Sequence, residues 1–336
     1  MKKVAVIKGD GTGPELIDVT LSVLKAAGSR AEFIPAEAGA EWWEKNKGPS
    51  FIPEDTWKLL GESDSCLKGP TTTLPIPGTP RSVAVSIRQK FELYANVRPV
   101  RTFPGQVGPL GEVDFVMVRE ATEGLYAGIE NKLSDDVSIA IRLITRNKST
   151  KVASFAFEEA ERRKWKKVVA ISKANILKIT DTTFLDAVRS VARKHPEIEL
   201  EDLFIDNMAQ QLVKNPQRFN RNVIVGTNLF MDILSEEASG IVGSIGVVYS
   251  GNIGDRFAMF EPAHGSSPKY KGKNKVDPTA TILSGAWMLD YLGEKKESRA
   301  IFNATRAVMK EGRYLTYDLG GRSGTKQMAQ AIIRKL

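Results

Sequence analysis

Two carboxylates in residues 228–236 have the spacing of a metal site. Asp232 and Glu236 lie four residues apart in a stretch that reads as the opening of a helix, so they share one helical face and can aim at one point. Mg²⁺ and Mn²⁺ take oxygen ligands of this kind, and substrate and water complete the shell. Taken alone, the pair is more simply explained as two acids near the positive end of a helix, so the hypothesis needs support from other residues.

Three arginines could bind an anionic substrate. Arg88, Arg98 and Arg119 stand near the ends of predicted elements, and Ser82 precedes Arg88 on the same predicted helix. Arginine holds carboxylates in two-point geometry better than lysine does, so the trio suits a di- or tricarboxylate. As isolated residues they are more often surface charges or salt-bridge partners, and this alternative stays open.

Tyr126 and Lys173 are the candidates for proton transfer. Lys173 ends a predicted strand over residues 167–172. A lysine beside a metal ion is a usable base, because the cation and burial both favour its neutral form. Spacing alone does not select this lysine among the many in the chain.

The composition restricts which classes of protein the chain can belong to. A chain of 336 residues, 42% hydrophobic and 26% charged, is long enough for two lobes, each with a core. The single cysteine, Cys66, excludes an intrachain disulfide, and two histidines leave few candidates for a His-based triad. We expect a reducing, cytoplasmic compartment, since neither a signal sequence nor a membrane-spanning apolar stretch is recognisable.

The net charge of +8 and the pI near 9.3 are compatible with nucleic acid or with small polyanionic ligands. Lys and Arg alternate with Asp and Glu along the chain, and no zinc-finger, helix-turn-helix or aromatic-basic signature occurs. We therefore expect a basic solvated surface, with neither a nucleic-acid nor a membrane partner.

The elements that position these residues are predicted to alternate between strands and helices. Strands are predicted at 2–8, 31–35, 66–68, 113–119, 139–146, 167–172 and 223–225, and helices at 14–27, after Pro53, and at 81–93, 149–163, 278–291, 297–309 and 324–335. This order indicates a mainly parallel sheet covered by helices. Residues 70–80 are turn-rich and form a candidate ligand loop or gate. The glycine turn at 9–13 lacks the third glycine of the Rossmann fingerprint, so a tight-turn role and a cofactor contact both stay open.

Several segments together resemble the decarboxylating β-hydroxyacid dehydrogenases, the isocitrate and isopropylmalate dehydrogenase family. The matching segments are GDGTGPE (9–15), RSVAVSIRQKFELYANVRPV (81–100), VREATEGLYAGIE (118–130), SKANILKITD (172–181), NLFMDILSEEASG (228–240), SGNIGD (250–255) and FEPAHGSSPKYKGKNKVDPTATILS (260–284). They lie in the family's order over nearly the whole chain. The resemblance implies a two-domain α/β fold that is not Rossmann, with a mixed, largely parallel sheet flanked by helices.

The resemblance also implies the domain organisation and the assembly. Residues 1–98 and 251–336 would form a large cofactor-side domain, and residues 99–250 a small domain for dimerisation and metal binding. Family members are dimers or larger homo-oligomers whose active sites borrow residues from the neighbouring subunit.

Individual roles follow from the same resemblance. Arg88, Arg98 and Arg119 would hold the α- and β-carboxylates of the malate moiety, Tyr126 would protonate the enolate carbon, and Lys173 of the partner subunit would accept the hydroxyl proton. Asp232, Glu236 and Asp206 of the partner subunit would hold Mg²⁺ or Mn²⁺. The cofactor would contact Thr72, Asn175, His264, Gly265, Lys269, Tyr270, Val276, Asp277 and Tyr317.

The helix that begins near Ser82 decides the substrate in this family. Isocitrate enzymes show an R-S-x-N-x-x-x-R-Q pattern whose serine binds the γ-carboxylate, whereas isopropylmalate enzymes have apolar side chains there. This chain reads RSVAVSIRQ, so it keeps Ser82 but has Ala84 where Asn is usual. The missing polar contact is worth about tenfold or more in discrimination. We expect isocitrate first, homoisocitrate next, and 3-isopropylmalate as a further alternative.

The loop after His264 indicates the cofactor. Lys269 and Tyr270 form the pair seen in NADP-using isocitrate enzymes, and Tyr317 also matches that type. A cation beside a 2′-phosphate is physically sensible. The arginine expected after Tyr317 is absent, with Gly321 in its place, so we expect NADP with NAD as the alternative.

Four positions depart from the family pattern: Ala121 stands for Asn, Asn220 for Asp, Met231 for Gly and Glu236 for Asp.

A competing interpretation is a non-catalytic regulatory subunit of a hetero-oligomeric isocitrate dehydrogenase. Loss of the catalytic tyrosine or lysine would favour it, but Tyr126 and Lys173 are both present.

Overall fold

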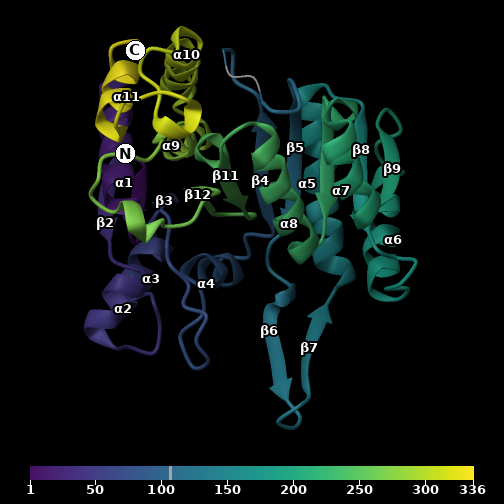
Figure 1. Cartoon of the computed structure of the whole chain (residues 1–336). Helices are drawn as coiled ribbons and strands as arrows, with labels where there is room; N and C mark the ends of the chain where they lie inside the picture. The colour runs from purple at the N-terminus through teal and green to yellow at the C-terminus, as the bar shows by residue number, and fades with distance from the viewer. Residues whose placement is uncertain (106–107) are drawn as a thin grey trace.

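A large sheet with helices on both faces organises the molecule, and a two-stranded arm projects from it (Figure 1). The computed structural model describes residues 1–105 and 108–336. In those residues the main sheet has the order β2 (Glu32–Ala36), β1 (Lys3–Ile7), β3 (Ser65–Lys68), β12 (Ala258–Pro262), β11 (Tyr249–Ile253), β4 (Ala95–Arg101), β5 (Asp114–Glu120), β10 (Asn222–Gly226), β8 (Lys167–Ser172) and β9 (Glu199–Phe204). The arm consists of β6 (Gly124–Lys132) and β7 (Ser138–Leu143).

Strand direction changes only in the centre of the main sheet. The pairs on either side, from β2 to β12 and from β5 to β9, are parallel. The pairs β12–β11, β11–β4 and β4–β5 are antiparallel. The sequence prediction of a mixed, largely parallel sheet that is not of the Rossmann type is therefore confirmed.

The helices cover both faces because successive strand residues point to opposite sides. They are α1 (Gly13–Ala26), α2 (Ala40–Asn46), α3 (Glu54–Glu62), α4 (Val83–Lys90), α5 (Arg146–Arg163), α6 (Thr180–Ala192), α7 (Ile205–Lys214), α8 (Asn228–Ile241), α9 (Thr279–Tyr291), α10 (Lys295–Glu311) and α11 (Thr325–Ile333). In β1, Val4 and Val6 pack with α1 and α9–α11, whereas Ala5 and Ile7 pack with α2–α4. Strands buried on both faces read as continuous apolar runs in the sequence.

The other half of the sheet follows the same rule. In β8, Val168 and Ala170 join the core under α5 and α6, and Val169 and Ile171 join the core under α7 and α8. Helix α8, which carries Asp232 and Glu236, is thus anchored by Met231 and Leu234 on its buried side. Asp232 and Glu236 lie outside this buried side.

Several predicted element boundaries were wrong, those of α4 and α5 among them. The helix predicted at 81–93 begins at Val83, and Ser82 is the extended residue before it. The strand predicted to end at Arg146 ends at Leu143, because the Thr145 side chain accepts a hydrogen bond from the Lys148 backbone N–H and starts α5 there. Strands β4, β6, β9, β11 and β12 and helices α2, α6 and α7 were not predicted.

The glycine turn is packed tightly against two distant loops. Gly9 and Gly11 have φ angles of 74° and 58°. A Cβ at Gly9 would lie 2.2 Å from the Pro70 carbonyl oxygen, and one at Gly11 would lie 2.2 Å from that of Ser266. Only glycine fits this conformation and this approach. The turn fixes the loop at 70–80, which has no regular element, beside the loop that follows β12.

The division into residues 1–98 plus 251–336 and residues 99–250 stays a prediction, since both segments contribute strands to one sheet. Within the described residues, none of the helices has both the length and the apolar character required to cross a membrane.

Candidate active site

The Asp232 carboxylate lies among the predicted arginines. Arg119, on β5, donates hydrogen bonds to Asp232 and, from Nε, to Asn228 Oδ1 at 2.9 Å. Arg98, on β4, has its Nη2 at 3.4 Å from Asp232 Oδ1 and its Nη1 at 3.1 Å from Glu236 Oε1. Both arginines are buried. The structure thus brings the two acids of α8 and two of the three predicted arginines into one cluster.

Charge decides the protonation of this cluster. Burial alone would raise the pKa of Asp232, but the Arg119 and Arg98 guanidiniums outweigh it and lower the pKa below its usual range. The pKa of Glu236 is raised, because burial outweighs its contact with Arg98. Burial lowers the pKa of Arg119 to about 10, which leaves the guanidinium charged at neutral pH. Asp232 is therefore the stronger anionic ligand of the pair.

Tyr126 lies directly on this cluster. Its hydroxyl donates a hydrogen bond to Asp232 Oδ2, and the Arg119 guanidinium lies 4.7 Å from the centre of its ring. Burial raises the pKa of Tyr126, so the hydroxyl keeps its proton at neutral pH. The arrangement can hold an anion and offer it a proton.

Arg88 is held by groups that the sequence analysis did not identify. Its Nη2 donates to Glu261 Oε1 at 2.8 Å, and its Nε donates to Asn252 Oδ1 at 2.7 Å. Lys68 Nζ lies 2.8 Å from the other oxygen of Glu261. All four residues are buried. Burial opposes ionisation of Glu261, but Lys68 and Arg88 lower its pKa to about 2.

A chain of amides continues this network to Arg98. Asn96 Nδ2 donates to Asn252 Oδ1 at 2.9 Å, and Arg98 Nε donates to Asn96 Oδ1 at 2.9 Å. These residues come from β4, β11 and β12, which are neighbours in the sheet. The buried network fixes the direction in which both guanidiniums point. Glu261 and Asn252 fall within segments that resemble the family, and this resemblance could have identified them as site residues.

Ser82 shares one cavity with Arg88 and Arg98. The cavity measures about 120 Å³ and is lined by Ser82, Ala84, Arg88, Arg98, Lys68, Thr71, Glu261 and His264, among others. We call it the arginine cavity. Its polar lining and size suit one small carboxylate-bearing group.

A second cavity, also about 120 Å³, holds most of the predicted cofactor residues. It is lined by His264, Tyr270, Val276, Asp277 and Tyr317, together with Thr12, residues 244–246, Ser267 and Asp318. We call it the tyrosine cavity. Because His264 lines both cavities, the two are neighbours.

Two lysines lie against the tyrosine rings that line this cavity. Tyr270 and Tyr317 have ring centres 5.8 Å apart. Lys269 Nζ lies 5.0 Å from the ring centre of Tyr270. Lys275, which sequence reasoning missed, lies 4.7 Å from Tyr317 and 5.5 Å from Tyr270. The charge-rich run KYKGKNK at 269–275 was the signal for it.

The remaining residues predicted at the cofactor site lie on loops. The Thr72 hydroxyl is 2.6 Å from that of Ser266, and its backbone N–H donates to Asp10 Oδ2 at 2.7 Å. Asp10, buried in the glycine turn, was also missed. Gly265 is exposed between His264 and Ser266. Thr72 and Gly265 are therefore chain neighbours of Thr71 and His264, which line these cavities.

Lys173, Asn175 and Asp206 belong to a different part of the chain. Lys173 follows β8, its Nζ lies 2.8 Å from Asp206 Oδ2 at the start of α7, and Asn175 is in the next turn. In residues 1–105 and 108–336, no three His, Cys, Asp or Glu side chains gather closely enough to hold a metal ion. Asp206 therefore does not join Asp232 and Glu236 within one chain.

Comparisons with known proteins agree with these features. The chain matches the sequence model described as isocitrate/isopropylmalate dehydrogenase over residues 3–332. It is 42% identical over 334 residues to the 3-isopropylmalate dehydrogenase of Methanothermobacter thermautotrophicus, covering 99% of this chain and 98% of that protein. It is 42% identical over 336 residues to the isocitrate/homoisocitrate dehydrogenase of Thermus thermophilus, with coverage of 99% and 98%.

A solved structure is similar to this chain over its whole length. The crystal structure of isocitrate dehydrogenase from Methylococcus capsulatus superposes with a TM-score of 0.95 at 42% identity, covering 100% of this chain and 99% of that one. The chain therefore belongs to the isocitrate/isopropylmalate dehydrogenase family and is a decarboxylating, NAD(P)-dependent dehydrogenase of that type.

Proposed function

We propose that the chain is an isocitrate dehydrogenase, which converts isocitrate to 2-oxoglutarate and CO₂ with reduction of NADP⁺. The observation that carries the proposal is the arginine cavity, in which Ser82 lies with Arg88 and Arg98. The Ser82 hydroxyl suits the additional carboxylate of isocitrate better than an isopropyl group, because an apolar group there would leave the hydroxyl without a partner.

The residues of α8 fit a hard divalent cation. Asp232 and Glu236 both bring carboxylate oxygens to one face of the helix, and Asp232 is held ionised by its arginines. Asp206 of the partner subunit would complete the protein ligands. When bound, Mg²⁺ or Mn²⁺ supplies a Lewis acid and the nicotinamide supplies the hydride acceptor.

The residues of the chain bind the substrate and move protons. Arg88, Arg98 and Arg119 hold its carboxylates, and Lys173 of the partner subunit accepts the proton of its hydroxyl. After CO₂ leaves, Tyr126 gives its hydroxyl proton to the carbon that carried the carboxylate. The raised pKa of Tyr126 suits this role, because the donor must be protonated when the carbanion forms.

The tyrosine cavity supports NADP⁺ as the cofactor. Lys269 and Lys275 lie against Tyr270 and Tyr317, so two cations are available to a 2′-phosphate although the usual arginine is absent. His264 Nε2 and Asp277 Oδ2 are buried without hydrogen-bond partners among the described residues, as expected of groups that bind a ligand. Replacing Lys269 by Asp together with Tyr270 by Ile should move preference toward NAD⁺, and an unchanged NADP⁺/NAD⁺ ratio of kcat/KM would argue against this assignment.

Exposed apolar side chains support assembly with a second copy. On α7 and α8, Val213 is 60% and Ile233 is 57% exposed, and beside Lys173, Ile176 and Ile179 are 68% and 83% exposed. The arm adds Ile129, Leu133, Val137, Ile139, Ile141 and Leu143, each at least 40% exposed. A dimer would cover such faces. It would also bring Lys173 and Asp206 of one subunit to Asp232 of the other.

A panel of substrates tests the proposal. Isocitrate, homoisocitrate and 3-isopropylmalate are each offered with NAD⁺ or NADP⁺, with and without Mg²⁺ or Mn²⁺, and reduced nicotinamide is followed by absorbance. We expect the highest kcat/KM with isocitrate, NADP⁺ and metal. Faster turnover of isopropylmalate than of isocitrate would overturn the assignment, and no turnover of any substrate would favour a non-catalytic subunit.

Homoisocitrate is the second candidate. Ala84 lines the arginine cavity where the isocitrate pattern has Asn, and its smaller side chain leaves space for a longer acid. Ala84→Asn should therefore raise the ratio of kcat/KM for isocitrate over homoisocitrate.

A further inference from the structure

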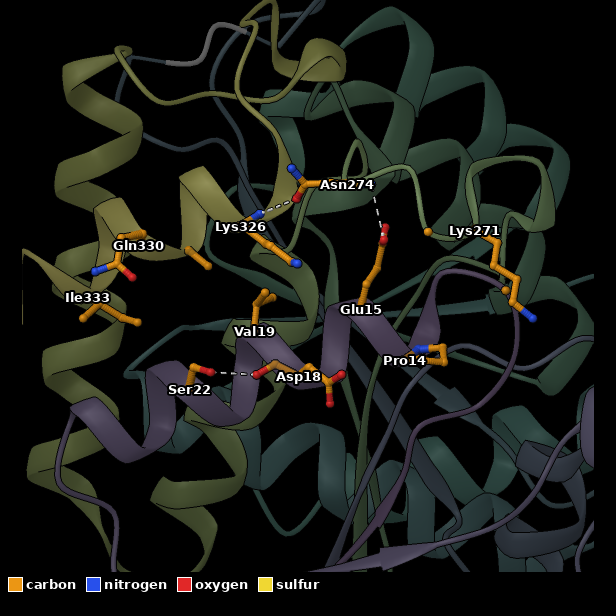
Figure 2. A pocket seen from close by; sticks show the side chains of 13 residues that line it. Pro14, Glu15, Asp18, Val19, Ser22, Lys271, Asn274, Lys326, Gln330 and Ile333 are labelled. Carbon is orange, nitrogen blue, oxygen red and sulfur yellow. Dashed lines mark hydrogen bonds between the residues drawn. The ribbon is translucent and has the colours of Figure 1, made fainter.

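A cavity of about 610 Å³ lies outside the proposed active site (Figure 2). It is enclosed by α1, α11 and residues 271–274, and none of the residues assigned to substrate, cofactor or metal line it. Its apolar surface is provided by Val19, Ala329 and Ile333, among others. The volume is in the range of pockets that bind small organic molecules.

One carboxylate in this cavity, that of Glu15, has an oxygen without a hydrogen-bond partner among the described residues. Glu15 Oε2 accepts a hydrogen bond from the Asn274 backbone N–H at 3.3 Å. Its other oxygen, Oε1, is buried and has no hydrogen-bond partner in the described part of the chain. Burial raises the pKa of Glu15 by more than the Asn274 N–H and the charge of Lys326 lower it. A ligand that donates to Oε1 would remove the cost of leaving it unsatisfied.

One cation in the cavity is also free. Among the described residues, no carboxylate lies within 4.0 Å of the Lys326 ammonium, whereas Asp18 is paired with Lys8 at 2.7 Å and Lys271 with Glu41 at 2.5 Å. Figure 2 shows Lys326 and Glu15 reaching into the same space from α11 and α1, above Val19. The cavity therefore offers one anion, one cation and an aliphatic surface.

We propose that this cavity binds a small zwitterion with an aliphatic body, of the class of aliphatic amino acids and their dipeptides. The ammonium group of the ligand donates to Glu15, its carboxylate pairs with Lys326, and its side chain packs on Val19, Ala329 and Ile333. Neither a simple amine nor a simple carboxylate uses both free charges.

The wall of the cavity is joined to the tyrosine cavity, which makes it an effector site. The Lys326 backbone N–H donates to Asn274 Oδ1 at 2.9 Å, and the Thr325 hydroxyl donates to the Val276 carbonyl oxygen at 2.6 Å. Val276 lines the tyrosine cavity. A ligand that orders the start of α11 and the Asn274 loop therefore alters the position of Val276. This coupling rests on the proposed function, whereas binding to the cavity does not.

Direct binding to the purified chain tests the site without any turnover. Calorimetry is run with L-leucine and L-leucyl-L-leucine, with isoamylamine and 4-methylpentanoate as probes that carry only one charge. We expect at least one zwitterion to bind about 10-fold more tightly than either single-charge probe, since one charged hydrogen bond is worth about that much. Equal affinities, or no binding of any probe, would overturn the proposal.

Substitutions test whether the zwitterion binds in this cavity. Glu15→Gln and Lys326→Gln should each weaken the zwitterion about 10-fold. Ser22→Trp, at the exposed rim of the cavity, should block binding without changing charge. Lys296→Gln, an exposed lysine on α10, is the matched control and should bind as the unaltered chain does. Melting temperatures establish that each variant is folded, and unchanged binding in the first three would overturn the site.

The effector role has its own readout. The affinity for NADP⁺, measured by protein fluorescence, should change when the zwitterion is present and should not change in Glu15→Gln. An affinity for NADP⁺ that is independent of the zwitterion would overturn the coupling. Failure of NADP⁺ to bind at all would instead count against the proposed function.

Discussion

Asp232 combines the contacts of a ligand with those of a structural anchor. It accepts hydrogen bonds from Arg119 and Tyr126 and lies 3.4 Å from an Arg98 nitrogen. Glu236 has a single contact of this kind, to Arg98, and its side chain is 47% exposed. The two acids of the pair are therefore unequal, and substitutions should separate their roles.

Asp232→Asn should abolish metal-dependent turnover, because the amide is a neutral and weaker ligand for a hard cation. Glu236→Asp should leave activity intact or improve it, since aspartate is the usual family residue and keeps the charge. Activity is measured over a titration of Mg²⁺ and Mn²⁺. Substantial turnover in Asp232→Asn, or a large loss in Glu236→Asp, would contradict this division of roles.

The raised pKa of Asp277 predicts how the free energy of unfolding depends on pH. It is buried in the tyrosine cavity, and burial together with the nearby Asp318 raises its pKa to about 8 from an ordinary value of 3.8. Between these values the folded chain binds a proton that the unfolded chain has lost, so stability falls as pH rises through this window. Asn resembles the protonated acid and lacks this penalty.

Asp277→Asn should therefore melt at a higher temperature than the unaltered chain at neutral pH. The difference should grow as pH rises from about 4 to about 8 and then level off. Melting curves over a pH series measure it. Curves of the two proteins that run parallel over the whole range would show that Asp277 does not carry the effect.

At the scale of elements, Glu261 joins four parts of the fold. From β12 it binds Lys68 on β3, Arg88 on α4 and Asn252 on β11. Glu261→Gln would leave two buried cations without their counter-charge, which costs about 3–5 kcal/mol of unfolding free energy. It should also raise KM for the substrate, because Arg88 loses the group that orients it.

Urea unfolding measures the loss of unfolding free energy in Glu261→Gln. Glu311→Gln is the matched control. Glu311 forms an ion pair with Lys335 in which both side chains are at least 40% exposed. Exposed pairs contribute roughly 0–1 kcal/mol. Similar losses in the two variants would mean that the buried network does not hold the site together.

The same network explains what sequence reasoning found and what it missed. Local periodicity predicts β1, β8 and α1, because their apolar residues recur with the period of the element. It does not set the order β3–β12–β11–β4, which alone makes neighbours of Lys68, Asn252 and Glu261. Arg88 was therefore predicted as a site residue while the groups that orient it were not. β6 was also missed, because most of its residues lie outside the core and do not alternate between buried and exposed.

At the scale of the whole molecule, the predicted site residues fall into two sets. Tyr126 and Asp232 lie together, and Lys173 is paired with Asp206 elsewhere on the chain. If a dimer shares its sites, each site takes one set from each subunit. Mutating one residue of each set, in different chains, then separates shared from unshared sites.

Lys173→Ala and Asp232→Asn should each be inactive alone but complement each other when mixed. In a hybrid dimer, one site has both substitutions and the other has neither. Random reassociation makes about half of the dimers hybrids, so the mixture should recover roughly a quarter of the unaltered activity. Two different affinity tags allow the hybrid to be purified and assayed.

The control is a mixture of Asp232→Asn with Tyr126→Phe. Both residues lie in the same set, so every site of that hybrid keeps one defect and no activity should return. Recovery in the first mixture and not in the second is expected only when Lys173 acts across the interface. An inactive Lys173→Ala/Asp232→Asn hybrid, purified as an intact dimer, would instead require each chain to assemble its site alone.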